Sequence, residues 1–266
     1  MNDSPRVILT NDDGYGSPGI EAMALTLESV ADVTVIAPRD DHSGIGRKMS
    51  GEVELEERER GYAVSGTPVD CVVVGLEELV PDADLVVAGC NKGANVGAPV
   101  LGRSGTVSAA VESAFFGVPA IAASQYIPVG AGDFAAVETT PEDYTEAVSV
   151  TARLLEVASE DSLFEGADYV NVNAPAPDRS PAPLEITRPA GSHAMSTRVE
   201  GARITMDDPI WTAMDEGTLE DPPGTDRRAI VEGRTSVSPL RVPHATGDLD
   251  RFRTAIPQDS ARPDSG

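Results

Sequence analysis

Short apolar runs alternate with amphipathic stretches along the first 125 residues of the chain. An apolar run bounded by glycine, proline or polar residues is typical of a buried strand, whereas apolar residues three and four positions apart are typical of a helix. The pattern predicts strands at residues 6–10, 33–37, 63–65, 85–88, 120–124 and 169–173. Proline directly after a capping residue predicts helices that begin at Ser17, Thr67 and Thr140, and a further helix of small residues is predicted over 106–116.

Strands that alternate with helices form βαβ units, which predict an α/β fold with a mostly parallel sheet and helices on both faces. In such a sheet a ligand binds beyond the carboxyl ends of the strands. Polar clusters directly follow three of the predicted strands, at residues 11–13, 38–44 and 89–97. We therefore expect these three clusters to meet at one edge of the sheet.

The C-terminal part of the chain has a different pattern. Four prolines between residues 174 and 183 predict an extended connection. Beyond it, LEITRP (184–189) and ARITMDDPIW (202–211) have the pattern of strands in a smaller antiparallel hairpin appendage, and the acidic stretch 52–59 predicts a solvated hairpin. We expect a core domain over residues 1–184, an extension over 185–254, and a polar, proline-containing, disordered tail over 255–266.

Composition narrows the class of protein. The chain has 266 residues, with 20 basic and 44 acidic side chains and a net charge of −24. Sequence-independent binding to nucleic acid is excluded, because it depends on basic side chains that neutralise phosphates. Among the basic residues only Lys48 and Lys92 are lysines, and so high a negative charge is tolerated best where salt screens it, which predicts adaptation to a salt-rich cytoplasm.

No apolar run approaches the length that crosses a bilayer, and Cys71 and Cys90 are too few for a disulfide framework, so we expect a cytoplasmic protein without a membrane partner.

Asn11-Asp12-Asp13-Gly14 is the most informative segment. Two adjacent carboxylates at the end of a buried strand resist joint ionisation unless something neutralises them. A hard divalent cation with oxygen ligands is one solution, and a turn capped by the asparagine and aspartate side chains is the alternative.

The other two clusters add uncharged oxygen and nitrogen groups. Ser43 offers a hydroxyl ligand, although a plain polar loop is the alternative for its segment. Asn91 and Asn95 lie in an Asn-x-Gly-x-Asn-x-Gly pattern, in which asparagine ligates or donates without adding charge and glycine lets backbone N–H groups face an anion. The three histidines show no paired spacing, so zinc is not expected.

Ser104-Gly105-Thr106 begins the small-residue helix. Free N–H groups at a helix start and two hydroxyls form a phosphate cradle, and Ser104 is also suited to cap the helix, which is compatible with that use. Arg103 either adds a phosphate contact or faces solvent. We expect Cys90 to be a small buried thiol, because no base is positioned to activate it.

Five motifs occur together, in order, within residues 7–124: ILTNDDGYGSPGI, APRDDHSG, SGTPVDCV, VVAGCNKGANVG and RSGTVSAAVESAFFGVPAIAAS. Weaker matches, YVNVNAP and GTDRRAIVEGRTSVSPL, continue to about residue 240. In these motifs and their spacing the chain resembles the SurE survival-protein family. The resemblance implies a Rossmann-like fold, metal-dependent phosphatase activity on nucleoside 5′- and 3′-monophosphates, and a homodimer or homotetramer built partly by exchanged C-terminal segments.

The same resemblance implies roles for individual residues. It implies one Mg²⁺ or Mn²⁺ per subunit, held by Asp12, Asp13, Ser43 and Asn91. It implies phosphate contacts from Asn95, Ser104, Gly105 and Thr106. Our own hypothesis for the mechanism is that Asp12 orients or deprotonates the attacking water. The chain departs from the family pattern at Lys92, Arg103 and Gly46, usually alanine, tyrosine and serine, and has Ile210-Trp211 in place of an aromatic pair.

Two further functions remain compatible with this site. A broader phosphomonoesterase or exopolyphosphatase would share it and differ only in substrate. A nucleotide-binding protein without catalysis is less favoured, because every implied ligand position holds a competent residue.

Overall fold

The structure is a computed structural model that describes residues 4–129, 134–160 and 163–242. The strands are β1 (Arg6–Thr10), β2 (Asp32–Pro38), β3 (Leu55–Arg58), β4 (Gly61–Val64), β5 (Leu85–Lys92), β6 (Ala120–Gln125), β7 (Tyr169–Ala174), β8 (Leu184–Ile186), β9 (Ser196–Glu200), β10 (Arg203–Asp207) and β11 (Thr235–Leu240). The α-helices are α1 (Pro18–Leu27), α2 (Pro68–Val74), α3 (Ala98–Leu101), α4 (Gly105–Phe115), α5 (Thr145–Glu160), α6 (Pro209–Asp215) and α7 (Asp226–Val231). A π-helical turn (Gly75–Leu79) continues α2, and 3₁₀ turns occupy Phe134–Ala136, Pro141–Tyr144 and Pro177–Arg179.

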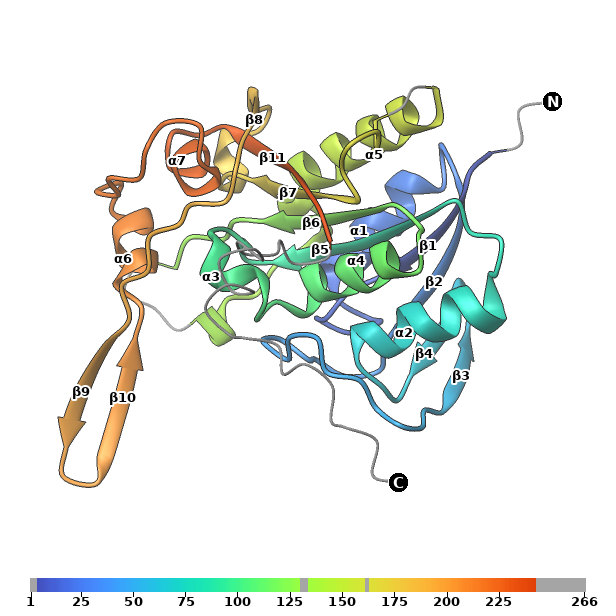
Figure 1. The fold of residues 1–266 in the computed structure, drawn as a ribbon, viewed down its shortest axis with the longest axis horizontal. Helices are drawn as coiled ribbons and strands as arrows, with labels where there is room; N and C mark the ends of the chain where they lie inside the picture. The colour runs from blue at the N-terminus through green and yellow to red at the C-terminus, as the bar shows by residue number, and fades with distance from the viewer. Residues whose placement is uncertain (1–3, 130–133, 161–162, 243–266) are drawn as a thin grey trace, which may run out of the picture.

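One sheet forms the centre of the molecule, with strands in the order β3-β4-β2-β1-β5-β6-β7-β11-β8 (Figure 1). The six strands from β4 to β7 are mutually parallel, while β3 and β11 run antiparallel to their neighbours β4 and β7. The predicted α/β fold with a mostly parallel sheet is therefore confirmed. Because β1, β2 and β5 are parallel neighbours, the segments that follow them lie at the same edge of the sheet.

Helices cover both faces of this sheet, and alternate residues of a strand face opposite layers. In β1, Val7 and Leu9 pack in the core under α1 and α5, whereas Ile8 packs in the core under α2 and α4. A glycine is needed where α1 approaches β5, because a Cβ added at Gly19 would lie 2.0 Å from the carbonyl oxygen of Cys90. This close packing fixes the start of α1 just after the Asp12–Asp13 segment.

The C-terminal part differs in detail from the expectation. Leu184–Ile186, expected in the antiparallel appendage, instead forms β8 and pairs in parallel with β11 at the edge of the main sheet. The antiparallel appendage is the hairpin of β9 and β10, which projects away from the body of the molecule (Figure 1). The strand expected over 202–211 ends at Asp207, because Asp208 caps α6 and Pro209 occupies its first turn. The tail predicted at 255–266 lies outside the described residues.

None of the helices in the described ranges is both long and apolar enough to cross a bilayer.

Candidate active site

Asp12 lies at the centre of the carboxyl edge, directly after β1 and against the first turn of α4. Its carboxylate accepts a hydrogen bond from the Thr106 hydroxyl, and the Gly105 and Thr106 backbone amides also bind it. The contact is close: a Cβ added at Gly105 would lie 2.7 Å from both the Cβ and Oδ2 atoms of Asp12. The start of α4, expected from the sequence to face a phosphate, therefore holds this carboxylate as well.

The two adjacent carboxylates sit in an environment that disfavours their joint ionisation. Burial raises the pKa of Asp12 above its usual range, although the hydrogen bonds from α4 oppose this effect. Burial, followed by the charges of Asp12 and Asp41, raises the pKa of Asp13 to about 7, against an opposing hydrogen bond from the Lys92 backbone N–H to Asp13 Oδ2 at 2.9 Å. Nearby positive charge would relieve this repulsion.

Asn91 lies near the end of β5, at the same edge of the sheet. Its amide nitrogen donates to the carbonyl oxygens of Gly93, at 2.7 Å, and Lys92, at 3.2 Å. These two bonds use both amide hydrogens, so the Oδ1 atom is the group of the side chain left for a ligand.

Ser43 reaches this edge through the loop after β2. The His42 backbone N–H donates to the carbonyl oxygen of Asp12 at 2.7 Å, which ties the loop to the carboxylate segment. The Ser43 hydroxyl is exposed and donates to Asp41 Oδ1 at 2.6 Å, so its oxygen retains lone pairs for a ligand.

The chemistry of these groups fits a hard divalent cation. The edge combines two carboxylates, a hydroxyl and an amide oxygen, which is an all-oxygen donor set. Across the described residues, no cluster of three or more His, Cys, Asp and Glu side chains is suited to hold a metal. A site here would therefore depend on the uncharged oxygens of Ser43 and Asn91 as well as on Asp12 and Asp13.

Asn95 is fixed by polar residues at the ends of β6 and β7. Its backbone N–H donates to Asn173 Oδ1 at 2.7 Å, and its carbonyl oxygen accepts from Asn171 at 2.9 Å and from Asn173 at 3.3 Å. Its side-chain amide donates one hydrogen to the Ser124 hydroxyl at 3.0 Å, which leaves the second hydrogen for an acceptor. Sequence reasoning missed Ser124, Asn171 and Asn173, although asparagines inside the buried strand YVNVN were a signal that a partner was required.

Ser104 caps α4, as expected. Its Oγ accepts a hydrogen bond from the Val107 backbone N–H at 3.1 Å, and its own hydroxyl proton remains available to a ligand. Thr106 differs, because its hydroxyl donates to Asp12. In this arrangement Thr106 holds the carboxylate, and a hydrogen bond from its hydroxyl to a phosphate requires the hydroxyl proton to turn away from Asp12.

A cavity of about 460 Å³ adjoins this edge and is lined by Asn91 and Asn95 on one side. Its other walls are largely aromatic and aliphatic, with Tyr126, Phe134, Ile127 and, from α6, Trp211. Asp215 fixes α6 in place, because it accepts hydrogen bonds from the Tyr126 hydroxyl and from the Val129 backbone N–H. The volume is in the range of pockets that bury a small organic ligand.

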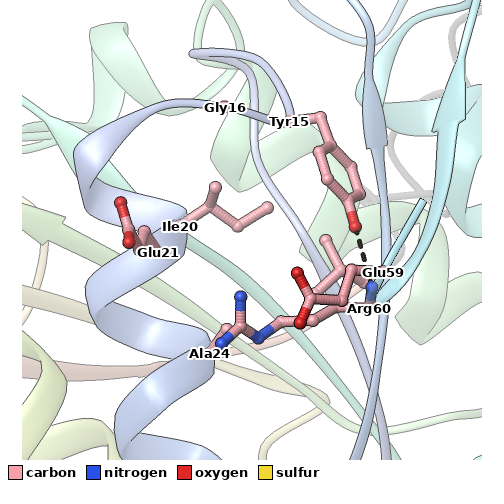
Figure 2. A pocket seen from close by; sticks show the side chains of 8 residues that line it. Tyr15, Gly16, Ile20, Glu21, Ala24, Glu59 and Arg60 are labelled. Atoms are coloured by element: carbon pink, nitrogen blue, oxygen red, sulfur yellow. Dashed lines mark hydrogen bonds between the residues drawn. The ribbon is translucent and has the colours of Figure 1, made fainter.

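A second, smaller hollow lies beside α1 and contains none of the candidate site residues. It has a volume of about 170 Å³, and Figure 2 shows Tyr15, Glu21 and Arg60 around it. The Tyr15 hydroxyl accepts a hydrogen bond from the Arg60 backbone N–H at 3.3 Å, and the Arg60 guanidinium pairs with Glu28. This hollow therefore has no part in the candidate site.

The fold and this edge define the class of the molecule: a Rossmann-like α/β protein with an oxygen-rich site at the carboxyl ends of its strands. The sequence profile of the family described as Survival protein SurE matches residues 7–196, and the chain belongs to the SurE family. It is 56% identical over 243 residues to the 5′-nucleotidase SurE of Natronomonas pharaonis, covering 90% of this chain and 94% of the relative. It is 52% identical to the protein of the same name from Haloarcula marismortui, covering 92% and 91% of the two chains. The crystal structure of the SurE protein from Aquifex aeolicus is similar in fold, with a TM-score of 0.75, 28% identity, and coverage of 95% of this chain and 98% of the other.

Proposed function

We propose that this protein is a metal-dependent 5′-nucleotidase, which hydrolyses nucleoside 5′-monophosphates, and also 3′-monophosphates, to nucleoside and phosphate. The observation that carries the proposal is the Asp12–Asp13 pair, held against the start of α4 beside a cavity with aromatic walls. The relatives named 5′-nucleotidase SurE support the same activity, because they match over nearly the whole chain.

Asp12, Asp13, Ser43 and Asn91 would hold one Mg²⁺ or Mn²⁺. When bound, such an ion supplies positive charge to the phosphate oxygens and lowers the pKa of a bound water. Asp12 is the residue that orients the attacking water or accepts its proton, since it is buried and its position is fixed by Thr106.

Donors from the loop before α4 and from the first turn of α4 hold the substrate phosphate in this proposal. Asn95 offers its second amide hydrogen and Ser104 offers its hydroxyl proton. Gly105 and Thr106 contribute the positive end of the α4 helix, which already stabilises Asp12. Donors fixed before the substrate arrives are what phosphoryl transfer requires, because the reaction depends on positioning and charge stabilisation.

The cavity receives the nucleoside. Trp211, Phe134 and Tyr126 provide apolar surface for a base, and the Asn91–Asn95 side places that base beside the phosphate site. An aromatic wall favours nucleotides over inorganic polyphosphate, because polyphosphate has no apolar surface to bury against it.

A substrate panel separates this proposal from its alternatives. Phosphate release is measured in molar KCl with Mg²⁺ or Mn²⁺ from 5′- and 3′-nucleoside monophosphates, glycerol 2-phosphate and short-chain polyphosphate. The proposal predicts the highest kcat/KM for a nucleoside monophosphate. Equal kcat/KM for glycerol 2-phosphate would favour the broader phosphomonoesterase, and faster polyphosphate turnover would favour the exopolyphosphatase. Tight nucleotide binding without turnover would favour a binding protein.

We also propose that the β9–β10 hairpin joins subunits into a homodimer or homotetramer. Val199 pairs with Ile204 and Thr197 pairs with Met206, so these four side chains share one face of the hairpin. Val199, Ile204 and Met206 are 65%, 61% and 73% exposed, an apolar face that a second subunit would cover.

Light scattering after gel filtration tests the role of the hairpin. The double variant Ile204→Thr/Met206→Thr should dissociate the oligomer, and Thr205→Ser on the opposite face should not. A monomeric wild-type protein at micromolar concentration would contradict the proposal.

The acidic surface suits a salt-rich cytoplasm, which we propose as the working environment of the protein. The net charge of −24 requires screening for a compact state, and the relatives from Natronomonas and Haloarcula are similar over most of the chain. The wild-type protein should therefore lose thermal stability when KCl is lowered from molar to millimolar concentration.

A further inference from the structure

A loop of residues 93–104 joins β5 to α4 through α3, and both Asn95 and Ser104 lie on it. The side of the loop next to β7 is held at Asn95 by Asn171 and Asn173. Its middle, two residues further on, is held by a part of the chain that the proposed mechanism does not use.

That second anchor is Asp226, the first residue of α7, which is fully buried. Its carboxylate accepts three backbone hydrogen bonds from three separate places. The Gly97 N–H donates to Oδ2 at 2.7 Å, the Ala190 N–H donates to Oδ1 at 2.9 Å, and the N–H of Arg227 donates to Oδ1 at 2.8 Å. The next residue of the loop binds the same Ala190 backbone, because the Ala98 N–H donates to the carbonyl oxygen of Ala190 at 2.8 Å.

The Arg227 side chain packs against the loop at Gly97. Its guanidinium is buried, pairs with Asp221 at 2.8 Å, and donates to the carbonyl oxygen and hydroxyl of Ser192 at 3.0 and 2.6 Å. A Cβ added at Gly97 would lie 3.1 Å from the central carbon of that guanidinium, and Gly97 has a φ of +84°. The backbone of the loop at Gly97 is therefore held by Asp226 and lies directly against the Arg227 guanidinium.

We infer that Asp226 and Arg227 are positioning residues for phosphoryl transfer, which act through Gly97 to set the distance between Asn95 and Ser104 across the phosphate site. The inference rests on the proposed function, since it assigns these two donors to the phosphate. Neither Asp226 nor Arg227 lines the cavity, and neither is among the proposed metal ligands or phosphate donors. This inference gives a role in positioning to the segment GTDRRAIVEG, which takes no part in the proposed chemistry itself.

The test compares Asp226→Asn and Arg227→Lys with Arg228→Gln, a control on the same helix whose partner, Glu232, is at the surface. In Asp226→Asn one N–H donor must face an amide NH₂ group in place of an oxygen, so the loop shifts at Gly97. We expect kcat for a nucleoside monophosphate to fall about 10–100-fold in Asp226→Asn, with Mg²⁺ affinity unchanged, and to remain at the wild-type value in Arg228→Gln. Arg227→Lys should retain more activity than Arg227→Met, because it keeps the charge opposite Asp221.

A double-mutant cycle separates positioning from general loss of structure. If Asp226 acts through Asn95, Asp226→Asn should lower kcat by less than about threefold in an Asn95→Ala background. An equal loss in both backgrounds, or a loss that follows the unfolded fraction in a thermal melt, would overturn the inference.

Hydrogen exchange gives a readout that does not depend on turnover. Amides of the 93–97 segment should exchange faster in Asp226→Asn than in the wild type, while those of residues 12–16 should be unchanged. Unchanged exchange at 93–97 would overturn the inference even if the wild-type protein hydrolyses nucleotides. If the wild type shows no turnover but the predicted difference in exchange between Asp226→Asn and the wild type is observed, the result counts against the proposed function alone. Binding of inorganic phosphate would then replace turnover as the readout, and the wild type should bind phosphate more tightly than Asp226→Asn does.

Discussion

Replacing Gly105 by alanine should displace Asp12 without changing any candidate side chain. An alanine Cβ at this position would lie 2.7 Å from two atoms of Asp12, roughly 0.7 Å closer than ordinary van der Waals contact. Asp12 is 3% exposed and lies against α4, so either its carboxylate or the first turn of α4 must shift by a similar amount. A displacement of about 1 Å in a reacting group costs on the order of 10²-fold in rate, so we expect kcat to fall about 10–100-fold. Overpacking of this kind also costs about 1–3 kcal/mol of unfolding free energy.

Gly102→Ala is the matched control for this substitution. Gly102 lies three residues before Gly105, has a right-handed backbone conformation, and has no atom within 4 Å of the position its Cβ would take. Kinetics with a nucleoside 5′-monophosphate and saturating Mg²⁺, together with a thermal melt of each variant, measure both effects. The reasoning is refuted if Gly105→Ala keeps the wild-type kcat, or if Gly102→Ala loses as much activity as Gly105→Ala does.

Two further predictions follow from the cavity and from the buried carboxylates. Trp211→Ala should raise KM for nucleoside monophosphates about 3–10-fold and leave kcat/KM for glycerol 2-phosphate unchanged, because only the nucleoside contacts the aromatic wall; equal losses on both substrates would remove Trp211 from base binding. The pKa of Asp13 is raised to about 7 from an ordinary 3.8. Between these two values the folded protein without metal keeps a proton on Asp13 that the unfolded chain releases. The free energy of unfolding should therefore fall as the pH rises from about 4 to 7. Mg²⁺ or Mn²⁺ should therefore raise Tm more at pH 8 than at pH 5, and a Tm that is the same in EDTA and in Mg²⁺ at pH 8 would contradict this account.

Local sequence patterns predicted the parallel part of the sheet closely. The strand expected at residues 6–10 is β1, and the helix starts at Ser17 and Thr67 are observed. Proline occupies the first turn of both helices, and the Thr67 side chain caps α2, whereas the Ser17 side chain makes no capping hydrogen bond to α1. The strand expected at 85–88 continues to Lys92, since its pairing with β6 carries it through glycine and polar residues that resemble a loop. Neighbouring strands thus override the local preference of that segment.

Long-range contacts account for what the sequence could not indicate. The insertion of β11 between β7 and β8 brings together residues about 50 to 70 positions apart, and no local pattern marks that pairing. The start of α6, in contrast, does have a local signal that the strand expected over 202–211 overlooked. Asp208 followed by Pro209 is the same combination of capping residue and proline that marks the other helix starts. The structure brings together the segments that carry the candidate site residues, but the partners that fix them, such as Asn173 and Asp226, depend on contacts between distant segments.

Metal-dependent turnover tests the central claim most directly. Phosphate release from a nucleoside 5′-monophosphate is measured in molar KCl with EDTA and after addition of Mg²⁺ or Mn²⁺, for the wild type, Asp12→Asn and Asp40→Asn, an exposed carboxylate in the neighbouring loop. We predict turnover that EDTA abolishes and metal restores, a loss of at least about 100-fold in Asp12→Asn, and wild-type behaviour in Asp40→Asn. Turnover that persists in EDTA, or full activity in folded Asp12→Asn protein, would contradict the assignment of this edge as a metal-dependent nucleotidase site.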